Sequence, residues 1–208
     1  MILLDLYLVR HGQSYGQLSD HSSPKQTGRM KDDWRLTELG QKQAEALGDH
    51  LAGTSFDAIY CSPLERAHAT AKAIQARQPK PIELQVMHDL LELDDYGPET
   101  PGEVHQRALR AARKLRGDAS PGARVLVVAH GAFNNRLLTA LLGLPAPAEI
   151  MRFGQDNTGL SRIIFASGYS PDCKNVRLYC MNDLSHLSPE LYAQTTAYNF
   201  KTLYGRPS

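Results

Sequence analysis

Two stretches of β-type residues in this chain end on the same dipeptide, His-Gly. The first stretch runs into Arg10-His11-Gly12, and the second runs into His130-Gly131. Parallel strands of an α/β fold bind ligands where they end, at the carboxyl edge of the sheet. We therefore expect Arg10, His11 and His130 to meet at one edge of a sheet.

A third β-type stretch, at residues 56–60, leads into the sequence Cys-Ser-Pro-Leu-Glu-Arg at residues 61–66. Pro63 is suited to the start of a helix, and Arg66 would fall in its first turn. Gly12 is expected to let the backbone turn sharply and to let a ligand come close. A buried strand with an exposed helix arginine would explain each feature alone. Their occurrence after three strands favours a shared site.

The apolar pattern alternates between strand and helix along the chain. It predicts strands at 2–9, 56–60, 82–86, 124–129, 161–166 and 175–181, and helices at 38–52, 63–77, 102–116 and 132–142. The final segment, residues 188–200, gives mixed helical signals. This order predicts an α/β fold with a doubly wound, mostly parallel sheet flanked by helices. A chain of 208 residues, 42% of them hydrophobic, has enough core for a single domain over residues 1–208.

Composition and charge narrow the function. A net charge of +1 gives no reason to expect nucleic acid as a partner. The three cysteines lack Cys-x-x-Cys spacing, so neither a disulfide framework nor a thiolate metal site is indicated. The N-terminal residues do not form a secretory signal, and no apolar run is long enough to cross a membrane. We expect a cytoplasmic protein that binds no metal, cofactor or membrane.

The three strand-end motifs together resemble those of the histidine phosphatase superfamily, the phosphoglycerate-mutase-like proteins. They stand here as Arg10-His11-Gly12, Ser62-Pro63-Leu64-Glu65-Arg66-Ala67 and His130-Gly131. Further similarity lies in Leu36-Thr37-Glu38-Leu39-Gly40-Gln41, Leu90-Leu91-Glu92 and Asn182-Asp183-Leu184-Ser185-His186-Leu187. The resemblance covers most of the chain. It implies a metal-independent phosphomonoester hydrolase that acts through a phosphohistidine intermediate.

The chemistry of the residues agrees with this resemblance. A neutral imidazole can attack phosphorus near pH 7 without a metal, so His11 is the candidate nucleophile. Phosphoryl transfer spreads negative charge over three oxygens, which favours a pocket of fixed donors made by Arg10, Arg66 and His130. The planar arginine fork can bind two phosphate oxygens at once. A protonated His130 would add further positive charge.

The leaving alkoxide needs a proton, which a nearby carboxylic acid can supply before acting as base for the attacking water. Glu92 stands where the family pattern places this acid, after Leu90-Leu91. Glu99 and Glu103 lie in the same segment and compete for the role. A solvated loop glutamate is the structural alternative for Glu92.

A long polar segment, residues 16–35, follows the candidate nucleophile. Long loops in compact domains are commonly functional, so we expect this segment to cover the site and help select the substrate. Gln17 stands where many relatives carry a phosphate-binding Asn. Thr27-Gly28 resembles the Thr-Gly that contacts substrate in the mutases. The resemblance therefore implies substrate-binding roles for Gln17 and Thr27.

Two alternatives remain open. A phosphomutase of the phosphoglycerate mutase type is disfavoured because the ten residues between Glu92 and Glu103 include no basic residue, whereas the mutases carry a long insertion with arginines there. Ala132 also replaces the Asn that follows His-Gly in the mutases. A weakly active phospho-ligand-binding protein would need the arginines but not His11. The expected substrate is a small-molecule phosphate ester, whose identity the motifs do not give.

Overall fold

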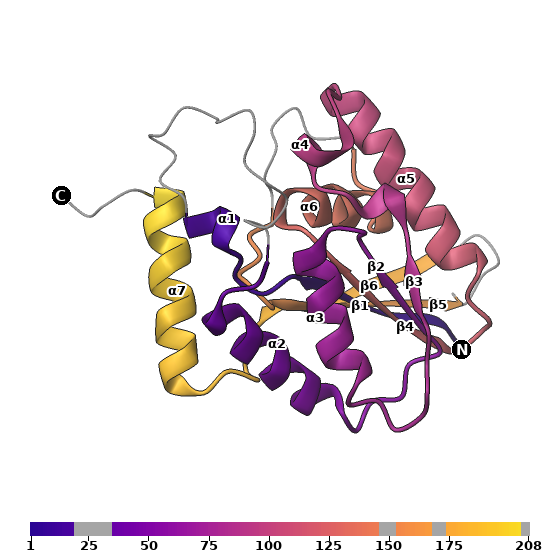
Figure 1. Cartoon of the computed structure of the whole chain (residues 1–208). Helices are drawn as coiled ribbons and strands as arrows, with labels where there is room; N and C mark the ends of the chain where they lie inside the picture. The colour runs from indigo at the N-terminus through magenta and orange to yellow at the C-terminus, as the bar shows by residue number, and fades with distance from the viewer. Residues whose placement is uncertain (19–34, 146–152, 168–173, 205–208) are drawn as a thin grey trace.

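A six-stranded sheet with helices on both faces forms the centre of the computed structural model, which describes residues 1–18, 35–145, 153–167 and 174–204 (Figure 1). The strands are β1 (Ile2–Arg10), β2 (Ala58–Cys61), β3 (Leu84–Val86), β4 (Ala123–Ala129), β5 (Leu160–Ser167) and β6 (Lys174–Asp183). The helices are α1 (Tyr15–Leu18), α2 (Glu38–Leu51), α3 (Glu65–Gln75), the 3₁₀ turn η2 (His88–Leu90), α4 (Leu93–Tyr96), α5 (Pro101–Gly117), α6 (Gly131–Leu141) and α7 (Pro189–Tyr204).

The strand order is β3-β2-β4-β1-β5-β6. Strands β1 to β4 pair in parallel, whereas β5 and β6 add to the edge in antiparallel pairs. The predicted α/β fold with helices on both faces is confirmed, and the sheet is mixed because β5 runs antiparallel to both of its neighbours, β1 and β6.

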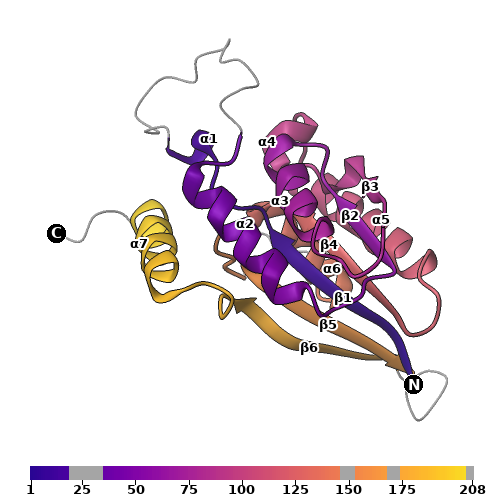
Figure 2. The ribbon, with the colours of Figure 1, turned by 60° about the horizontal axis from the view of Figure 1, so that its bottom comes forward.

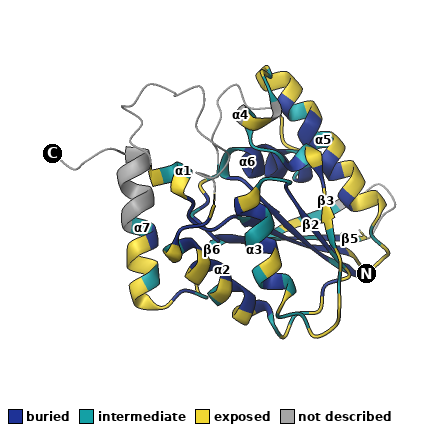
Figure 3. Ribbon diagram, viewed as in Figure 1, coloured by how far each residue is buried: buried dark blue, intermediate teal, exposed yellow. Residues whose placement is uncertain are grey.

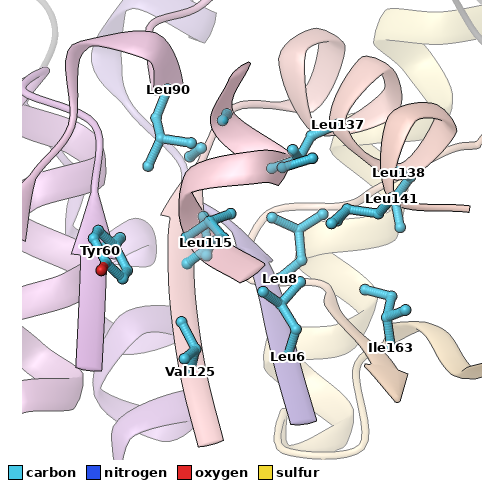
Figure 4. Packing of buried hydrophobic residues seen from close by; sticks show 14 of the residues in the cluster. Leu6, Leu8, Tyr60, Leu90, Leu115, Val125, Leu137, Leu138, Leu141 and Ile163 are labelled. Carbon is cyan, nitrogen blue, oxygen red and sulfur yellow. The ribbon is translucent and has the colours of Figure 1, made fainter. Parts of the chain in front are cut away.

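Two hydrophobic cores lie on opposite faces of the sheet, because successive side chains of a strand point to opposite sides. Leu6 and Leu8 of β1 belong to the cluster with α5 and α6, including Leu115 and Leu137 (Figure 4). Val9 of β1 belongs to the cluster with α2 and α3. Figure 2 shows α2 and α3 on one side of the strands, and Figure 3 shows the strands buried beneath helices with exposed outer faces.

Local capping explains where two of the helices begin. The Thr37 side chain accepts a hydrogen bond from the Gly40 amide at the start of α2. Thr100 and Glu103 form a reciprocal capping box at the start of α5. The expected start of α3 at Pro63 was early: the helix begins at Glu65, although Arg66 still falls in its first turn.

Helix α7 accounts for the mixed helical signals near the end of the chain. It lies beside α2 in both ribbon views (Figures 1 and 2), and Gln43 Nε2 donates a hydrogen bond of 2.7 Å to Thr195 Oγ1 between the two helices. Both residues are buried, so polar side chains occupy part of this helix contact.

Among the helices that the structure describes, none is long and apolar enough to cross a bilayer. One domain over residues 1–208 stays a prediction.

The segment after β1 packs so closely on α2 that two glycines are required. A Cβ at Gly12 would lie 2.5 Å from the Gly40 carbonyl oxygen, and one at Gly40 would lie 2.0 Å from the Gln13 oxygen. Gly12 therefore serves a close backbone contact, and it is not among the glycines with positive φ. The expected sharp turn is not the reason for this glycine.

We expect Gly40→Ala to lower the free energy of unfolding by about 1–3 kcal/mol, the usual cost of overpacking a core. The backbone atoms that a new methyl group would meet cannot move aside like a side chain. Gly53→Ala is the matched control, because no atom lies within 4 Å of the Cβ it would add. Urea unfolding of both variants measures the difference, and equal midpoints would contradict the close contact.

Candidate active site

The register of three parallel strands brings the predicted residues to one edge of the sheet. Arg10 in β1 stands beside Ala129 in β4, and Cys61 in β2 stands beside Val128 in β4. The amide of His11 then donates to the Ala129 oxygen at 3.0 Å. The residues that directly follow β1, β2 and β4 are consequently neighbours: the rings of His11 and His130 lie 5.1 Å apart, centre to centre.

The hydrogen bonds of His11 fix which ring nitrogen holds its proton. Nδ1 lies 2.7 Å from the Gly12 carbonyl oxygen, which can only accept, so Nδ1 carries the hydrogen. Nε2 is then the nitrogen with a lone pair, and it accepts a hydrogen bond of 3.2 Å from Arg66 Nε. Burial and the charges of Arg66 and Arg10 lower the pKa of His11 well below its ordinary value. His11 is therefore a neutral imidazole whose lone pair is on Nε2.

Both predicted arginines are present at this edge. Arg66 is buried in the first turn of α3 and also donates from Nη2 to Asp95 Oδ2 at 3.0 Å. Arg10 donates from Nη1 to the Gln155 carbonyl oxygen at 2.6 Å. A Cβ on Gly131 would lie 3.2 Å from Arg10 Nε, so the glycine after His130 leaves room for this guanidinium. The arrangement supplies two fixed positive charges around His11.

His130 is fully buried, and its Nε2 lies 2.8 Å from the hydroxyl oxygen of Ser62. Burial lowers its pKa well below the ordinary value, and the neighbouring His11, Arg66, Arg10 and Arg107 lower it further. A lowered pKa favours the neutral form of His130 in the site without phosphate, whereas the additional charge considered from the sequence would need the protonated form. Two arginines already supply positive charge there, and a third cation would be repelled.

Glu92 contacts both the start of α4 and the first turn of α6. Its carboxylate accepts hydrogen bonds from the amides of Leu93 at 3.1 Å, Ala132 at 3.3 Å and Phe133 at 2.9 Å. It therefore caps α4 and contacts the first turn of α6, directly after His130. Burial raises the pKa of Glu92, while the three amides and Arg10 oppose the rise. The carboxyl group thus holds its proton to higher pH than an exposed glutamate.

The two competing glutamates are engaged elsewhere. Glu99 accepts two hydrogen bonds from the buried Arg107, of 2.9 Å and 2.5 Å. Arg107 Nη1 also donates to the carbonyl oxygens of Asp89 and Leu91, at 3.0 Å and 2.8 Å. Glu103 is exposed and bonded to Thr100 in the capping box. Arg107 therefore ties the segment that carries Glu92 to α5, a role the sequence reasoning missed.

Other supporting residues were also missed. Thr70, one turn after Arg66, accepts from the Gly12 amide at 3.0 Å and donates to the Arg66 carbonyl oxygen at 2.8 Å. Asn157 Nδ2 donates to the His11 carbonyl oxygen at 3.0 Å. The amide of Thr158, a residue with φ of 58°, donates to the Arg10 carbonyl oxygen at 3.0 Å. Thr70 could have been noticed in the sequence, because it is a polar residue beside the apolar positions Ala67, Ala71 and Ile74 of the same helix.

The predicted substrate-binding residues are only partly described. Gln17 lies in α1, where its Oε1 accepts from the Ser14 amide at 2.9 Å and from Asn157 Nδ2 at 3.2 Å. It is thus connected to the loop that holds His11. Thr27 and most of the 16–35 segment lie outside the described residues, so their roles stay predictions. The part of the chain that the structure describes contains no group of three or more His, Cys, Asp or Glu side chains arranged to hold a metal ion.

Comparison with known proteins gives the family of the chain. The model of the histidine phosphatase superfamily (branch 1) matches residues 6–97 and 87–176. An uncharacterized phosphatase, PhoE, of Bacillus subtilis is 31% identical over 202 residues, covering 87% of this chain and 95% of that protein. The adenosylcobalamin/alpha-ribazole phosphatase of Escherichia coli is 28% identical over 176 residues, with 69% and 81% covered.

A solved structure supports the fold. A mutant of phosphoserine phosphatase from Entamoeba histolytica, in complex with phosphoserine, matches with a TM-score of 0.68 and 22% identity, covering 89% of this chain and 100% of that one. The family model, the relatives and the three strand-end motifs all indicate the same superfamily. This chain belongs to the histidine phosphatase superfamily.

Proposed function

We propose that this protein hydrolyses phosphomonoesters through a phosphohistidine formed on His11. The observation that carries the proposal is the paired bonding of the His11 ring. Nδ1 is committed to the Gly12 oxygen, and the Nε2 lone pair faces the Arg66 guanidinium. An anion drawn to Arg66 and Arg10 would thus meet the nucleophilic nitrogen.

In the first step, the Nε2 lone pair of His11 forms a bond to phosphorus while the bond from phosphorus to the ester oxygen breaks. Glu92 gives its proton to the departing oxygen. In the second step, Glu92 takes a proton from water, whose oxygen attacks phosphorus as the bond from phosphorus to Nε2 breaks. Inorganic phosphate leaves and the neutral imidazole returns. Arg10, Arg66 and His130 hold the three transferring oxygens throughout.

The choice of Glu92 as acid is supported by its position at the turn that follows His130 and by the hydrogen bonds that Glu99 and Glu103 make elsewhere. Its carboxylate contacts the first turn of α6, directly after His130, and its pKa is raised by burial. Glu99 is paired with Arg107, and Glu103 caps α5. An acid with a raised pKa is matched to donating a proton near neutral pH.

The substrate that we propose is a small-molecule phosphate ester. A phosphatase screen over a metabolite panel with EDTA present tests activity, metal independence and substrate class together. The panel should include phosphoserine and alpha-ribazole phosphate, the ligand or substrate type named for two of the similar proteins. Lack of turnover across the panel, in a folded protein, would contradict the proposal. A cytoplasmic location also stays a prediction.

The two other functions make different predictions. A phosphomutase would interconvert 2- and 3-phosphoglycerate, whereas we expect only release of phosphate. The segment between Glu92 and Glu103 contains no basic residue to bind a second acidic group. A phospho-ligand-binding protein would show saturable phosphate binding without labelled phosphate retained on the chain. The defined nucleophilic nitrogen of His11 favours the hydrolase.

We expect Arg66→Lys to reduce kcat/KM almost as much as Arg66→Ala. The loss in transition-state stabilisation should be about 2–4 kcal/mol, as for other removed oxyanion donors. Arg66 uses separate nitrogens to reach His11 and Asp95, and a lysine ammonium cannot reproduce that planar fork. Arg77→Lys is the control, because Arg77 pairs with the exposed Asp49. Near-normal kcat/KM in Arg66→Lys would remove Arg66 from the phosphate pocket.

A further inference from the structure

Ser62, which has no role in the site described above, forms a hydrogen bond with His130. Its Oγ lies 2.8 Å from His130 Nε2, and both residues are fully buried. The Ser62 amide donates to the Val128 carbonyl oxygen at 3.0 Å, which fixes the serine backbone at the end of the sheet. The contact is therefore part of a rigid edge.

The direction of this hydrogen bond follows from what each atom can still do. Ser62 Oγ accepts a hydrogen bond of 3.4 Å from the Leu64 amide, and its own hydrogen needs an acceptor. Among the described residues, His130 Nε2 is the acceptor within reach. Donation from the hydroxyl to Nε2 satisfies the hydroxyl hydrogen and the Nε2 lone pair, and leaves one buried group, Nδ1–H, for a ligand. The reverse direction would leave two buried groups unbonded, the hydroxyl hydrogen and the Nδ1 lone pair, which costs more.

The second ring nitrogen of His130, Nδ1, indicates what this hydrogen bond does. Nδ1 is buried and has no hydrogen-bonding partner in the part of the chain that the structure describes. If Nε2 accepts from Ser62, the hydrogen of a neutral imidazole must sit on Nδ1. His130 then offers an N–H donor in a buried site beside His11.

We propose that Ser62 is a positioning residue that holds neutral His130 with its proton on Nδ1, ready to donate to a phosphoryl oxygen. The inference rests on the proposed function for its phosphoryl ligand, but the tautomer itself does not. The groups that act on the charge of His130 are His11, Arg66, Arg10 and Arg107. All of them disfavour an imidazolium, so a neutral donor avoids adding a further cation.

The direct test is the nitrogen-15 NMR spectrum of the histidine rings at neutral pH, without substrate. Protonated and unprotonated imidazole nitrogens differ widely in chemical shift, and the His130 signals are identified by their loss in His130→Asn. We expect a protonated Nδ1 and an unprotonated Nε2 in the wild type, with inorganic phosphate shifting the Nδ1–H signal. Ser62→Ala should move the proton toward Nε2. A wild-type proton on Nε2, or an unchanged tautomer in Ser62→Ala, would overturn the proposal.

Kinetics give a second readout. We expect Ser62→Ala to lower kcat/KM about 10- to 100-fold. This range is taken by analogy from metal-ligating histidines that lose the hydrogen-bonding partner of the ring. The residual activity should rise as pH falls, because protonated His130 carries a hydrogen on Nδ1 with or without the serine. Ser62→Thr, which keeps a hydroxyl, should restore both the tautomer and the rate.

Thr139→Val is the matched control, since it removes a buried hydroxyl whose bond is to the Asn135 carbonyl oxygen within α6. It should change neither the tautomer nor the pH profile. A loss in Ser62→Ala with the wild-type pH profile would show only a structural role and overturn the proposal. Because the NMR measurement needs no turnover, a protein with the expected tautomer and no phosphatase activity would contradict the proposed function alone.

Discussion

A folded His11→Ala variant is expected to lose at least about 10⁴-fold in kcat, the scale of removing a catalytic nucleophile. The wild type should retain acid-labile labelled phosphate after rapid quenching, and the variant should retain none. The physical reason is that the variant lacks the imidazole whose Nε2 lone pair contacts Arg66, the atom that we propose attacks phosphorus. Normal turnover by the folded variant would rule out the covalent mechanism.

A histidine control separates this effect from a general loss of imidazole. His50 is exposed at the end of α2, and His50→Ala should turn over normally. The fold of His11→Ala is checked by thermal unfolding. The main-chain bonds around position 11, from its amide to Ala129 and from Asn157 to its carbonyl oxygen, do not involve the deleted ring. A folded but inactive variant is therefore expected.

The sequence predicted the parts of the site that lie directly after strands. Arg10, His11 and His130 are each placed by the strand before them, and parallel pairing with register brings the strand ends together. Arg66 follows the same logic, because it lies in the first turn of the helix that follows β2. These residues were predictable because a local pattern fixes both their type and their position.

The residues that support the site were harder to predict because their partners are distant in the chain. Asn157 and Thr158 contact the backbone of Arg10 and His11 from the approach to β5, and no local motif marks them. Arg107 carried a signal that was overlooked: it falls in the apolar stripe of α5, between Val104 and Ala111. A charged residue at a buried helical position indicates a paired or hydrogen-bonded role.

Contacts across the fold also decide between residues that look alike in the sequence. Glu92, Glu99 and Glu103 lie within one segment, and spacing alone does not separate them. The structure gives them different partners, because Arg107 binds Glu99 and Glu103 belongs to the cap of α5, and this difference supports the proposal of Glu92 as the acid. The mixed sheet likewise depends on a distant contact, the antiparallel pairing of β5 with β1.

The second large effect concerns the acid. Glu92→Gln should slow hydrolysis of alkyl phosphates by about 10²- to 10⁴-fold, the usual contribution of a general acid. Aryl phosphates with acidic phenols should lose far less in the first step, because their oxygen leaves without a proton. Their phosphohistidine should then accumulate, because the base for the attacking water is missing. Glutamine keeps an oxygen that can accept from the Phe133 amide, so the contact with α6 survives.

The raised pKa of Glu92 also predicts the direction in which kcat/KM changes with pH. Burial raises the pKa of Glu92, and the acid acts in its protonated form, so kcat/KM for alkyl phosphates should fall as pH rises through that pKa. His11 must be neutral to attack, and its pKa is well below the ordinary value, so the acid limb lies below pH 6.5. Glu92→Gln should abolish the basic limb for alkyl phosphates and leave the acid limb in place.

Glu103→Gln is the matched control, because Glu103 is exposed and confined to the cap of α5. Steady-state rates on p-nitrophenyl phosphate and on a sugar phosphate, compared across Glu92→Gln, Glu99→Gln and Glu103→Gln, decide the assignment. Equal losses on both substrates, with no trapped phosphohistidine, would reduce Glu92 to a structural cap of α4 and α6. A selective loss in Glu99→Gln would instead move the role to Glu99, which would require its pair with Arg107 to open during turnover. Since that pair is buried and doubly hydrogen-bonded, opening it would be costly, and we therefore predict Glu92 rather than Glu99 as the acid.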